Sequence, residues 1–195
     1  MRPSTADDVR EFARLVAEGL VWRLVADVHV GLDEPDDRRL RAGGAAELLP
    51  DRLVDGGAAL TGADAAWVYA GGEGPERLHL VMPVGRGRAG TPHVVVHEGR
   101  VPPADVELVH GVPVTVPARA AADLARGLPT AAALPMLRRL AAAVPLDPRD
   151  ALVQLERLSG CRGVEAGRQT VLAWAAEHAD RQTGPVLSPA ARSSR

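Results

Sequence analysis

The sequence of 195 residues contains no lysine, no isoleucine and no asparagine, and all 23 of its basic residues are arginine. Walker-type phosphate loops, Schiff-base enzymes and the usual metal-dependent nuclease cores each need a lysine amine. The missing amine therefore excludes these three classes on residue type alone. Cys161 is the only cysteine, which excludes an internal disulfide and a cysteine-rich metal site and fits a reducing compartment.

Long apolar runs are also missing, so no segment is predicted to span a membrane. Residues 1–10 carry Asp7 and Asp8 where a signal peptide would carry basic residues, and no apolar stretch follows. We therefore expect a cytoplasmic protein without a membrane partner. The length suits one sizeable hydrophobic core better than two full domains.

Charge is unevenly distributed along the chain. Residues 1–78 contain 15 acidic residues and 9 arginines, a net charge of −6, whereas residues 79–195 contain 10 and 14, a net charge of +4. The basic half suits an acidic protein or a phosphate backbone, although scattered arginines more often form a solvated face. The candidate contact residues are Arg86, Arg88, Arg119, Arg138 and Arg139.

Apolar periodicity predicts the N-terminal elements. A helix is expected over residues 5–19 and one half-buried strand over residues 22–30, where apolar residues alternate. A second helix is expected over residues 36–49. Thr61 is expected to cap a third helix, which ends at Gly71.

The remainder of the chain is predicted to be a sheet followed by helices. Strands are expected over residues 78–84 and 93–97, and one or two more over residues 106–116, which Gly111 interrupts. Helices are expected over residues 118–126, 134–144, 148–158 and 163–178, with Asp147 capping the third. The fold class is therefore α/β: an N-terminal helix with a wing-like strand, a mixed or antiparallel sheet and a C-terminal helical cluster.

Two local patterns resemble functional motifs, but the secondary structure expected around each differs from the one that the motif requires. Gly85, Gly87 and Gly90 match the dinucleotide fingerprint, but a strand rather than a helix is expected to follow, so the loop should join two strands. His93 and His97 have the spacing of a zinc pair on a helix, but on a strand they stand roughly 13 Å apart. We therefore predict no cofactor and no metal.

No catalytic constellation stands out in the sequence, and we expect a protein that is not an enzyme and acts by binding. An unfamiliar active site would require Asp123, His110 and Arg119 to converge in one pocket. The three tryptophans fall on apolar stripes and are predicted to lie in the core.

The order of the motifs resembles the AbiEi-type antitoxins of actinobacteria. The resemblance extends over residues 20–178, and its most specific part is the segment GVPVTVPARAAADLA, from Gly111 to Ala125. In this family a Gly-Leu-Pro-Val-Thr turn leads into an Arg-Thr-x-x-Asp-Leu-Ala helix. The family's Thr is Ala120 here.

The resemblance implies a winged-helix DNA-binding region at the N-terminus, an α/β body, and neutralisation of a nucleotidyltransferase-like toxin from an adjacent gene in a type IV pair. On this basis residues 1–32 are a partial winged-helix-like segment, residues 33–180 the AbiEi-like body and residues 181–195 a disordered tail. The first helix has a net charge of −2, which argues against a place in the major groove of DNA.

Three hypotheses follow. The leading one is a binding protein similar to AbiEi antitoxins that acts on a toxin or as a transcriptional regulator. This hypothesis includes both an active protein and a degenerate one that has lost its activity. The alternatives are a nucleic-acid-binding accessory protein that uses an arginine-rich face, and an unrecognised enzyme.

Overall fold

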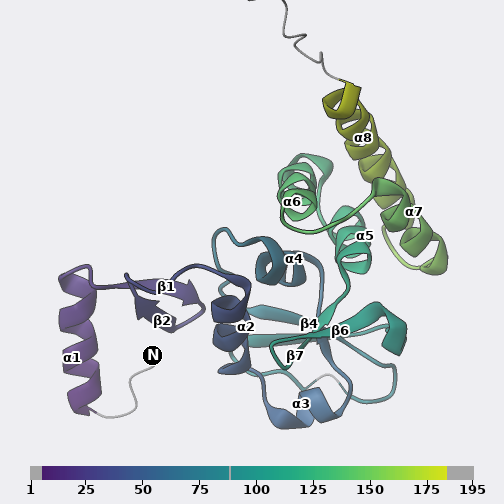
Figure 1. Ribbon diagram of the computed structural model, residues 1–195. Coiled ribbons are helices and arrows are strands. Elements are labelled where there is room, and N and C mark those ends of the chain that lie inside the picture. Colours follow the sequence, from purple (N-terminus) through teal and green to yellow (C-terminus); the bar gives the residue numbers. More distant parts are fainter. Residues whose placement is uncertain (1–5, 88, 184–195) are drawn as a thin grey trace, which may run out of the picture.

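The computed structural model describes residues 6–87 and 89–183. Figure 1 shows a central sheet with helices around it, a helical cluster at one end, and a helix with a two-stranded hairpin projecting to one side. The predicted α/β class and mixed sheet are confirmed. None of the helices in these described ranges is long and apolar enough to cross a membrane.

The N-terminal region consists of one helix and a hairpin. α1 (Ala6–Ala17) confirms the predicted helix, and β1 (Val21–Val25) pairs antiparallel with β2 (Val28–Gly31). The prediction of one strand over residues 22–30 was wrong, because Ala26 adopts a left-handed backbone with φ 48° and reverses the chain. The alternation of apolar residues continues along both arms of the hairpin and so did not reveal the turn.

The central sheet contains five strands, β3 to β7. They span Ala59–Leu60, Leu78–Met82, Val94–Glu98, Val106–Val109 and Val112–Thr115. The strand order is β5-β4-β3-β7-β6, with β3–β7 and β4–β5 parallel and β3–β4 and β6–β7 antiparallel. The strands expected from the alternation are confirmed, whereas β3 was not predicted because two residues show no period.

Three helices lie between the hairpin and β4 in the chain. They are α2 (Arg38–Ala46), α3 (Asp51–Asp55) and α4 (Gly62–Ala70). α2 begins at Asp37, whose Oδ1 accepts a hydrogen bond from the Leu40 N–H at 2.7 Å. α3 is a single short turn and was not predicted.

Arg41 fastens α2 to the end of α4. Its side chain is buried, its Nε donates to the Val68 carbonyl at 3.1 Å, and its guanidinium pairs with Asp36 at 2.8 Å. It thereby satisfies a carbonyl that the last turn of α4 leaves without a helical partner. The chain leaves α4 through Gly71, whose φ of 69° favours glycine.

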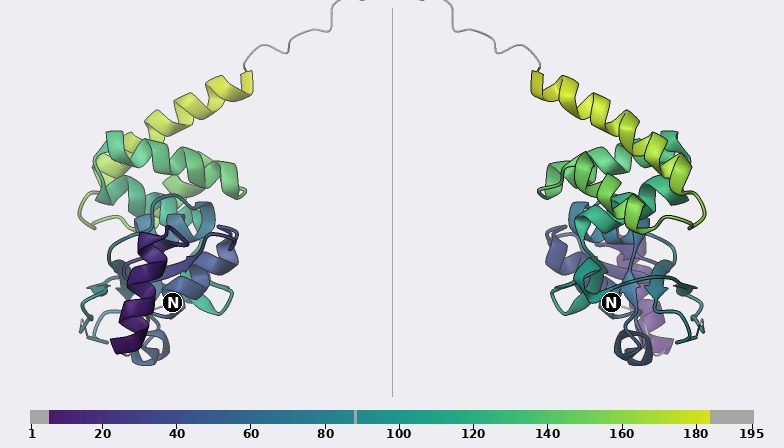
Figure 2. Two further views of the ribbon diagram at one scale, coloured as in Figure 1. Left: turned by 90° about the vertical axis from the view of Figure 1, so that its left-hand side faces the viewer. Right: turned by 90° about the vertical axis from the view of Figure 1, so that its right-hand side faces the viewer.

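Four helices, α5 to α8, form the C-terminal cluster (Figure 2). They span Pro117–Gly127, Thr130–Ala143, Pro148–Arg157 and Val164–Thr183. α5 packs against α6, α7 and α8 within the cluster, and both α5 and α6 pack against α4 and so join the cluster to the rest of the fold. α8 includes the first three residues of the predicted tail 181–195, and the others lie outside the described residues.

The core extends from the hairpin to the helical cluster. Trp67 and Trp174 are 3% and 0% exposed, and Trp22 is half-buried against the same core. The predicted core role of the three tryptophans is confirmed. α1 adds little to this core, since Val9 and Val16 are 52% and 47% exposed.

The hairpin rests on the loop that follows α4. The Ala26 N–H donates to the Pro75 carbonyl at 2.8 Å. Gly74 approaches the hairpin so closely that a Cβ placed on it would lie 1.7 Å from the carbonyl oxygen of Leu24. Only glycine therefore fits at this position without a shift of the backbone.

Gly74→Ala is expected to lower the free energy of unfolding by about 1–3 kcal/mol, because the hairpin backbone must move to admit the methyl group. Gly43→Ala is the control: its methyl group meets open space on α2, so it should raise stability by about 0.5–1 kcal/mol. Urea denaturation measures both. A Gly74→Ala protein as stable as the parent would contradict the close contact.

Candidate binding cleft

A buried ion network lies within the most specific motif of the sequence. Arg119 and Asp123 are one turn apart on α5, and Nε of Arg119 donates to Oδ2 of Asp123 at 2.8 Å. Their side chains are 2% and 5% exposed. The Thr61 hydroxyl donates to the same oxygen at 2.7 Å. Thr61 is the N-cap residue of α4, as predicted, but its side chain ties α4 to α5 and makes no cap hydrogen bond.

The network continues from Arg119 to the segment that precedes β6. Its Nη1 donates to Oδ2 of Asp105 and to the Arg100 carbonyl, each at 3.0 Å. Asp105 ends the short 3₁₀ helix η1 (Pro103–Asp105), and its Oδ1 accepts from Gln154 of α7 at 3.2 Å. One guanidinium therefore joins α5 to the connection between β5 and β6, and through Asp105 to α7.

A cleft of about 640 Å³ opens beside this network. Its walls come from the start of α4, from β4 and β5, from α5, and from the turn between α7 and α8. The volume lies within the range of small-molecule sites. Val81, Leu124 and Leu158 give the cleft an apolar part, and the exposed thiol of Cys161 lies at its border.

Two histidines form one wall of the cleft. His79 and His97 stand on the neighbouring parallel strands β4 and β5, with their rings stacked at a centroid distance of 5.9 Å. Nδ1 of His79 lies 3.0 Å from Oδ2 of the buried Asp64, and this hydrogen bond raises the pKa of His79 above its usual 6.5. His93 lies instead near Asp27, at 3.6 Å. Within the described residues, no three acidic, histidine or cysteine side chains are grouped to hold a metal ion.

Positive charge gathers in the cleft. Its lining contains two carboxylates, Glu98 and Asp123, and four arginines, which are Arg100, Arg119, Arg126 and Arg162. Nε of Arg126 donates to Oδ1 of Asp123 at 2.8 Å, so Arg119 and Arg126 share this carboxylate. Arg100 and Arg162 are exposed. The cleft is therefore suited to an anionic ligand.

Part of this site could have been found in the sequence. Arg119, Asp123 and Arg126 follow one another at spacings of four and three, which places them on one face of a helix. Arg100 and Arg162 lie outside this helix, and no local pattern connects them with it. Sequence analysis therefore did not identify Arg100, Arg126 and Arg162 as site residues.

Those of the predicted contact arginines that the structure describes come from three separate segments, and Arg138 and Arg139 are neighbours on α6. Arg138 joins α6 to α8 by pairing with both carboxylate oxygens of Glu177 at 2.7 Å. Arg139 lies over Gly72, where a Cβ would come within 2.6 Å of its Nη1. Arg138 thus has a local structural role, Arg139 lies close to the backbone at Gly72, and neither lines the cleft.

The other three predicted arginines have different surroundings. Arg119, a candidate contact residue, is buried, and two carboxylates compensate its charge. Arg86 is exposed in the loop that joins β4 directly to β5, which confirms that the glycine-rich segment joins two strands. Arg88 lies outside the described residues.

The hypothesised catalytic group of Asp123, His110 and Arg119 does not assemble. His110 lies in the turn between β6 and β7, with a left-handed φ of 48°. The four residues of β7 separate it from the start of α5 by roughly 13 Å. Asp123 and Arg119 line the cleft and His110 does not.

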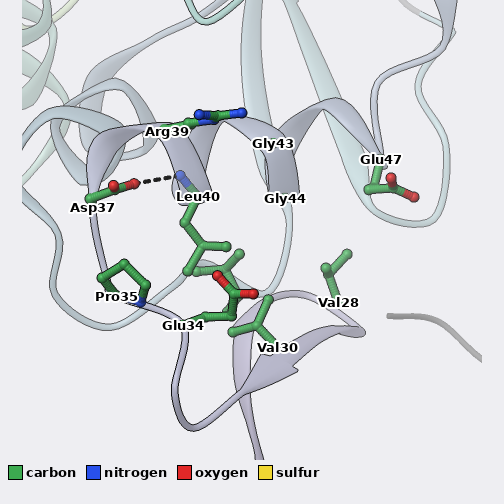
Figure 3. Close-up of a pocket in the computed structure, with 11 residues that line it drawn as sticks. Val28, Val30, Glu34, Pro35, Asp37, Arg39, Leu40, Gly43, Gly44 and Glu47 are labelled. Carbon is green, nitrogen blue, oxygen red and sulfur yellow. Dashed lines mark hydrogen bonds between the residues drawn. The ribbon is translucent and has the colours of Figure 1, made fainter.

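A second cavity, of about 590 Å³, lies between the hairpin and α2. Figure 3 shows Leu40 pointing from α2 towards the hairpin, where Val28 and Val30 face it. We call this cavity the hairpin groove. Its acidic residues are Glu34, Asp37 and Glu47, and its basic residue is Arg39. Its lining therefore has a net charge opposite to that of the cleft.

Arg119→Met is expected to lower the free energy of unfolding by about 3–5 kcal/mol, because the buried carboxylates of Asp105 and Asp123 would both lose their ion pair with Arg119, and Arg126 remains only for Asp123. Arg138→Met is the matched control, since it also breaks an arginine–carboxylate pair, but at the exposed surface, and should change stability little. Chemical denaturation measures both. Equal effects of the two variants would contradict the structural role of the network.

Protonation of His79 is expected to stabilise the fold. Because its pKa is raised in the folded state, this contribution is complete below about pH 6.5 and is lost as the pH rises through the folded-state pKa. NMR titration of the imidazole should show a pKa above 6.5 that falls in Asp64→Asn. A His79 resonance that titrates at or below 6.5 would contradict the hydrogen bond.

Among the comparisons with known proteins, the family match agrees with the sequence resemblance. The crystal structure of the RV2827C protein from Mycobacterium tuberculosis is similar over 87% of this chain and 69% of that chain, with a TM-score of 0.44 and 18% sequence identity. No curated protein matches the sequence. The family described as AbiEi antitoxin C-terminal domain matches residues 58–171, which is more than half of the sequence. The chain therefore belongs to the AbiEi antitoxin C-terminal domain family.

Proposed function

We propose that the chain is the antitoxin of a toxin–antitoxin pair and neutralises its toxin by binding it. The family match over residues 58–171 is the observation that carries this proposal. The partner we propose is a nucleotidyltransferase-like toxin encoded by an adjacent gene. This function requires a complementary surface and no catalytic group of the antitoxin.

Charge supports the hairpin groove as the place where the toxin docks. A nucleotidyltransferase handles phosphate-bearing substrates, and proteins that do so present basic surfaces. The groove offers apolar side chains between acidic residues, which suits an apolar segment with basic neighbours. The excess of acidic residues over residues 1–78 favours the same partner.

We further propose that residues 1–32 derive from a winged helix without serving as its DNA-reading part. α1, β1 and β2 follow one another in the order helix, strand, strand, in which a winged helix ends. Arg14 of α1 is paired with Glu11 at 2.7 Å and with Glu18 at 3.1 Å, so its charge is compensated within the helix. The proposal therefore rests on protein binding and does not include promoter recognition.

Gly43→Arg tests the docking site. Gly43 is exposed in the groove, and a side chain there meets open space, so the substitution adds bulk and positive charge without disturbing α2. Binding to the co-purified toxin should weaken by about tenfold or more, because like charges face each other. Ala46→Arg, exposed on the same helix outside the groove lining, should bind as the parent does.

Co-expression with the adjacent gene tests the antitoxin function separately from the proposed docking site. The parent chain should restore growth to cells that produce the toxin, and Gly43→Arg should not. If the parent chain neither restores growth nor binds the toxin, the antitoxin function is wrong. If both arginine variants restore growth and bind equally, the function stands but the groove is not the docking site.

A further inference from the structure

The cleft contains positive charge that the fold itself does not use. Asp123 already pairs with Arg119 and Arg126 and accepts a hydrogen bond from the Thr61 hydroxyl, so its single negative charge is offset within the fold. Arg100 takes part in the network only through its backbone carbonyl. Its guanidinium extends from an exposed residue that lines the cleft.

A second exposed arginine, Arg162, enters the cleft from the turn between α7 and α8. Its carbonyl accepts a weak hydrogen bond from Nη1 of Arg126 at 3.4 Å, so these two residues are neighbours. Guanidinium groups that converge from different segments form forked donor sets, which match the oxygens of a phosphate group. Gly62 and Ala63, the first residues of α4, also line the cleft and add the positive end of a helix dipole.

The remaining walls offer a place for a flat ring. The stacked imidazoles of His79 and His97 stand at one side, and Nε2 of His79 is the ring nitrogen that does not face Asp64. Leu124 and Leu158 are apolar parts of the lining. Stacking on a planar side chain beside apolar groups is how proteins hold nucleobases without reading their sequence.

We propose that this cleft binds a mononucleotide-type ligand, with its phosphate between Arg100, Arg126 and Arg162 and its base against the histidine pair. The volume of about 640 Å³ is sufficient for one nucleotide. The site is distinct from the hairpin groove, since the two cavities share no lining residue. The proposal does not depend on the antitoxin function.

Calorimetric titration of the full chain with AMP, adenosine and inorganic phosphate tests the ligand class. AMP should bind about tenfold or more tightly than adenosine, because only AMP makes the charged contacts. It should also bind more tightly than inorganic phosphate, which lacks the ring. Equal affinities for AMP and adenosine would overturn the phosphate site, and equal affinities for AMP and phosphate would overturn the base site. Absence of AMP binding would overturn the whole proposal.

Arginine variants test whether AMP binds in the cleft. The double variant Arg100→Ala/Arg162→Ala removes two exposed side chains and keeps the backbone carbonyl that Arg119 needs, so its melting temperature should stay unchanged while AMP affinity falls about tenfold or more. Arg86→Ala, which also removes an exposed arginine, is the control and should bind AMP normally.

Cys161 reports occupancy of the cleft independently of the variants. It is the only cysteine of the chain, it is exposed, and it lines the cleft. AMP should slow its reaction with a thiol reagent, whereas adenosine at the same concentration should not. AMP binding that leaves both the labelling rate and the double variant's affinity unchanged would place the ligand elsewhere and overturn the proposal.

Discussion

The burial of one guanidinium, that of Arg119, is the constraint on which the arrangement of the body depends. A charged group leaves water only when its neighbours replace the lost solvation. Here two carboxylates and a backbone carbonyl do so, and they come from α5 itself and from the connection between β5 and β6. The helical cluster and the edge of the sheet must therefore be in place together before Arg119 can be buried. The cleft is the open space beside this junction.

The sequence predicted those elements whose signals are local. Asp147 accepts a hydrogen bond from the Arg149 N–H and begins α7 where a cap was expected, and the turn at Gly111 divides β6 from β7. The hairpin was missed because alanine at position 26 gives no turn signal, although its backbone is left-handed. α3 and β3 were missed because each is too short to show a period.

The cleft was beyond sequence analysis for a different reason. Its lining residues come from several separate segments, and only the fold brings Arg100, Arg126 and Arg162 together. The arginines chosen from the overall charge distribution were reasonable by composition, but pairing partners decide whether an arginine is free for a ligand. Glu177 occupies Arg138, and Asp105 and Asp123 occupy Arg119. The motif that carries the family resemblance thus has a structural role in Arg119 and Asp123.

The cleft and the hairpin groove belong to different parts of the chain. The cleft is lined entirely by residues within the family match, whereas the groove is lined by residues 24–47, before it begins. The two sites can therefore change independently among proteins that share this domain.

Arg119 and Arg126, the arginines beside Asp123, also determine how the charge of the cleft depends on pH. A guanidinium keeps its charge at every pH at which proteins fold, so the cations at the junction are permanent. The hydrogen bond with Asp64 raises the pKa of His79 on the wall, so this imidazole, unlike the guanidinium groups, gains or loses its charge as the pH changes. Acidification therefore adds positive charge to the cleft at His79, while the charges of Arg119 and Arg126 do not change.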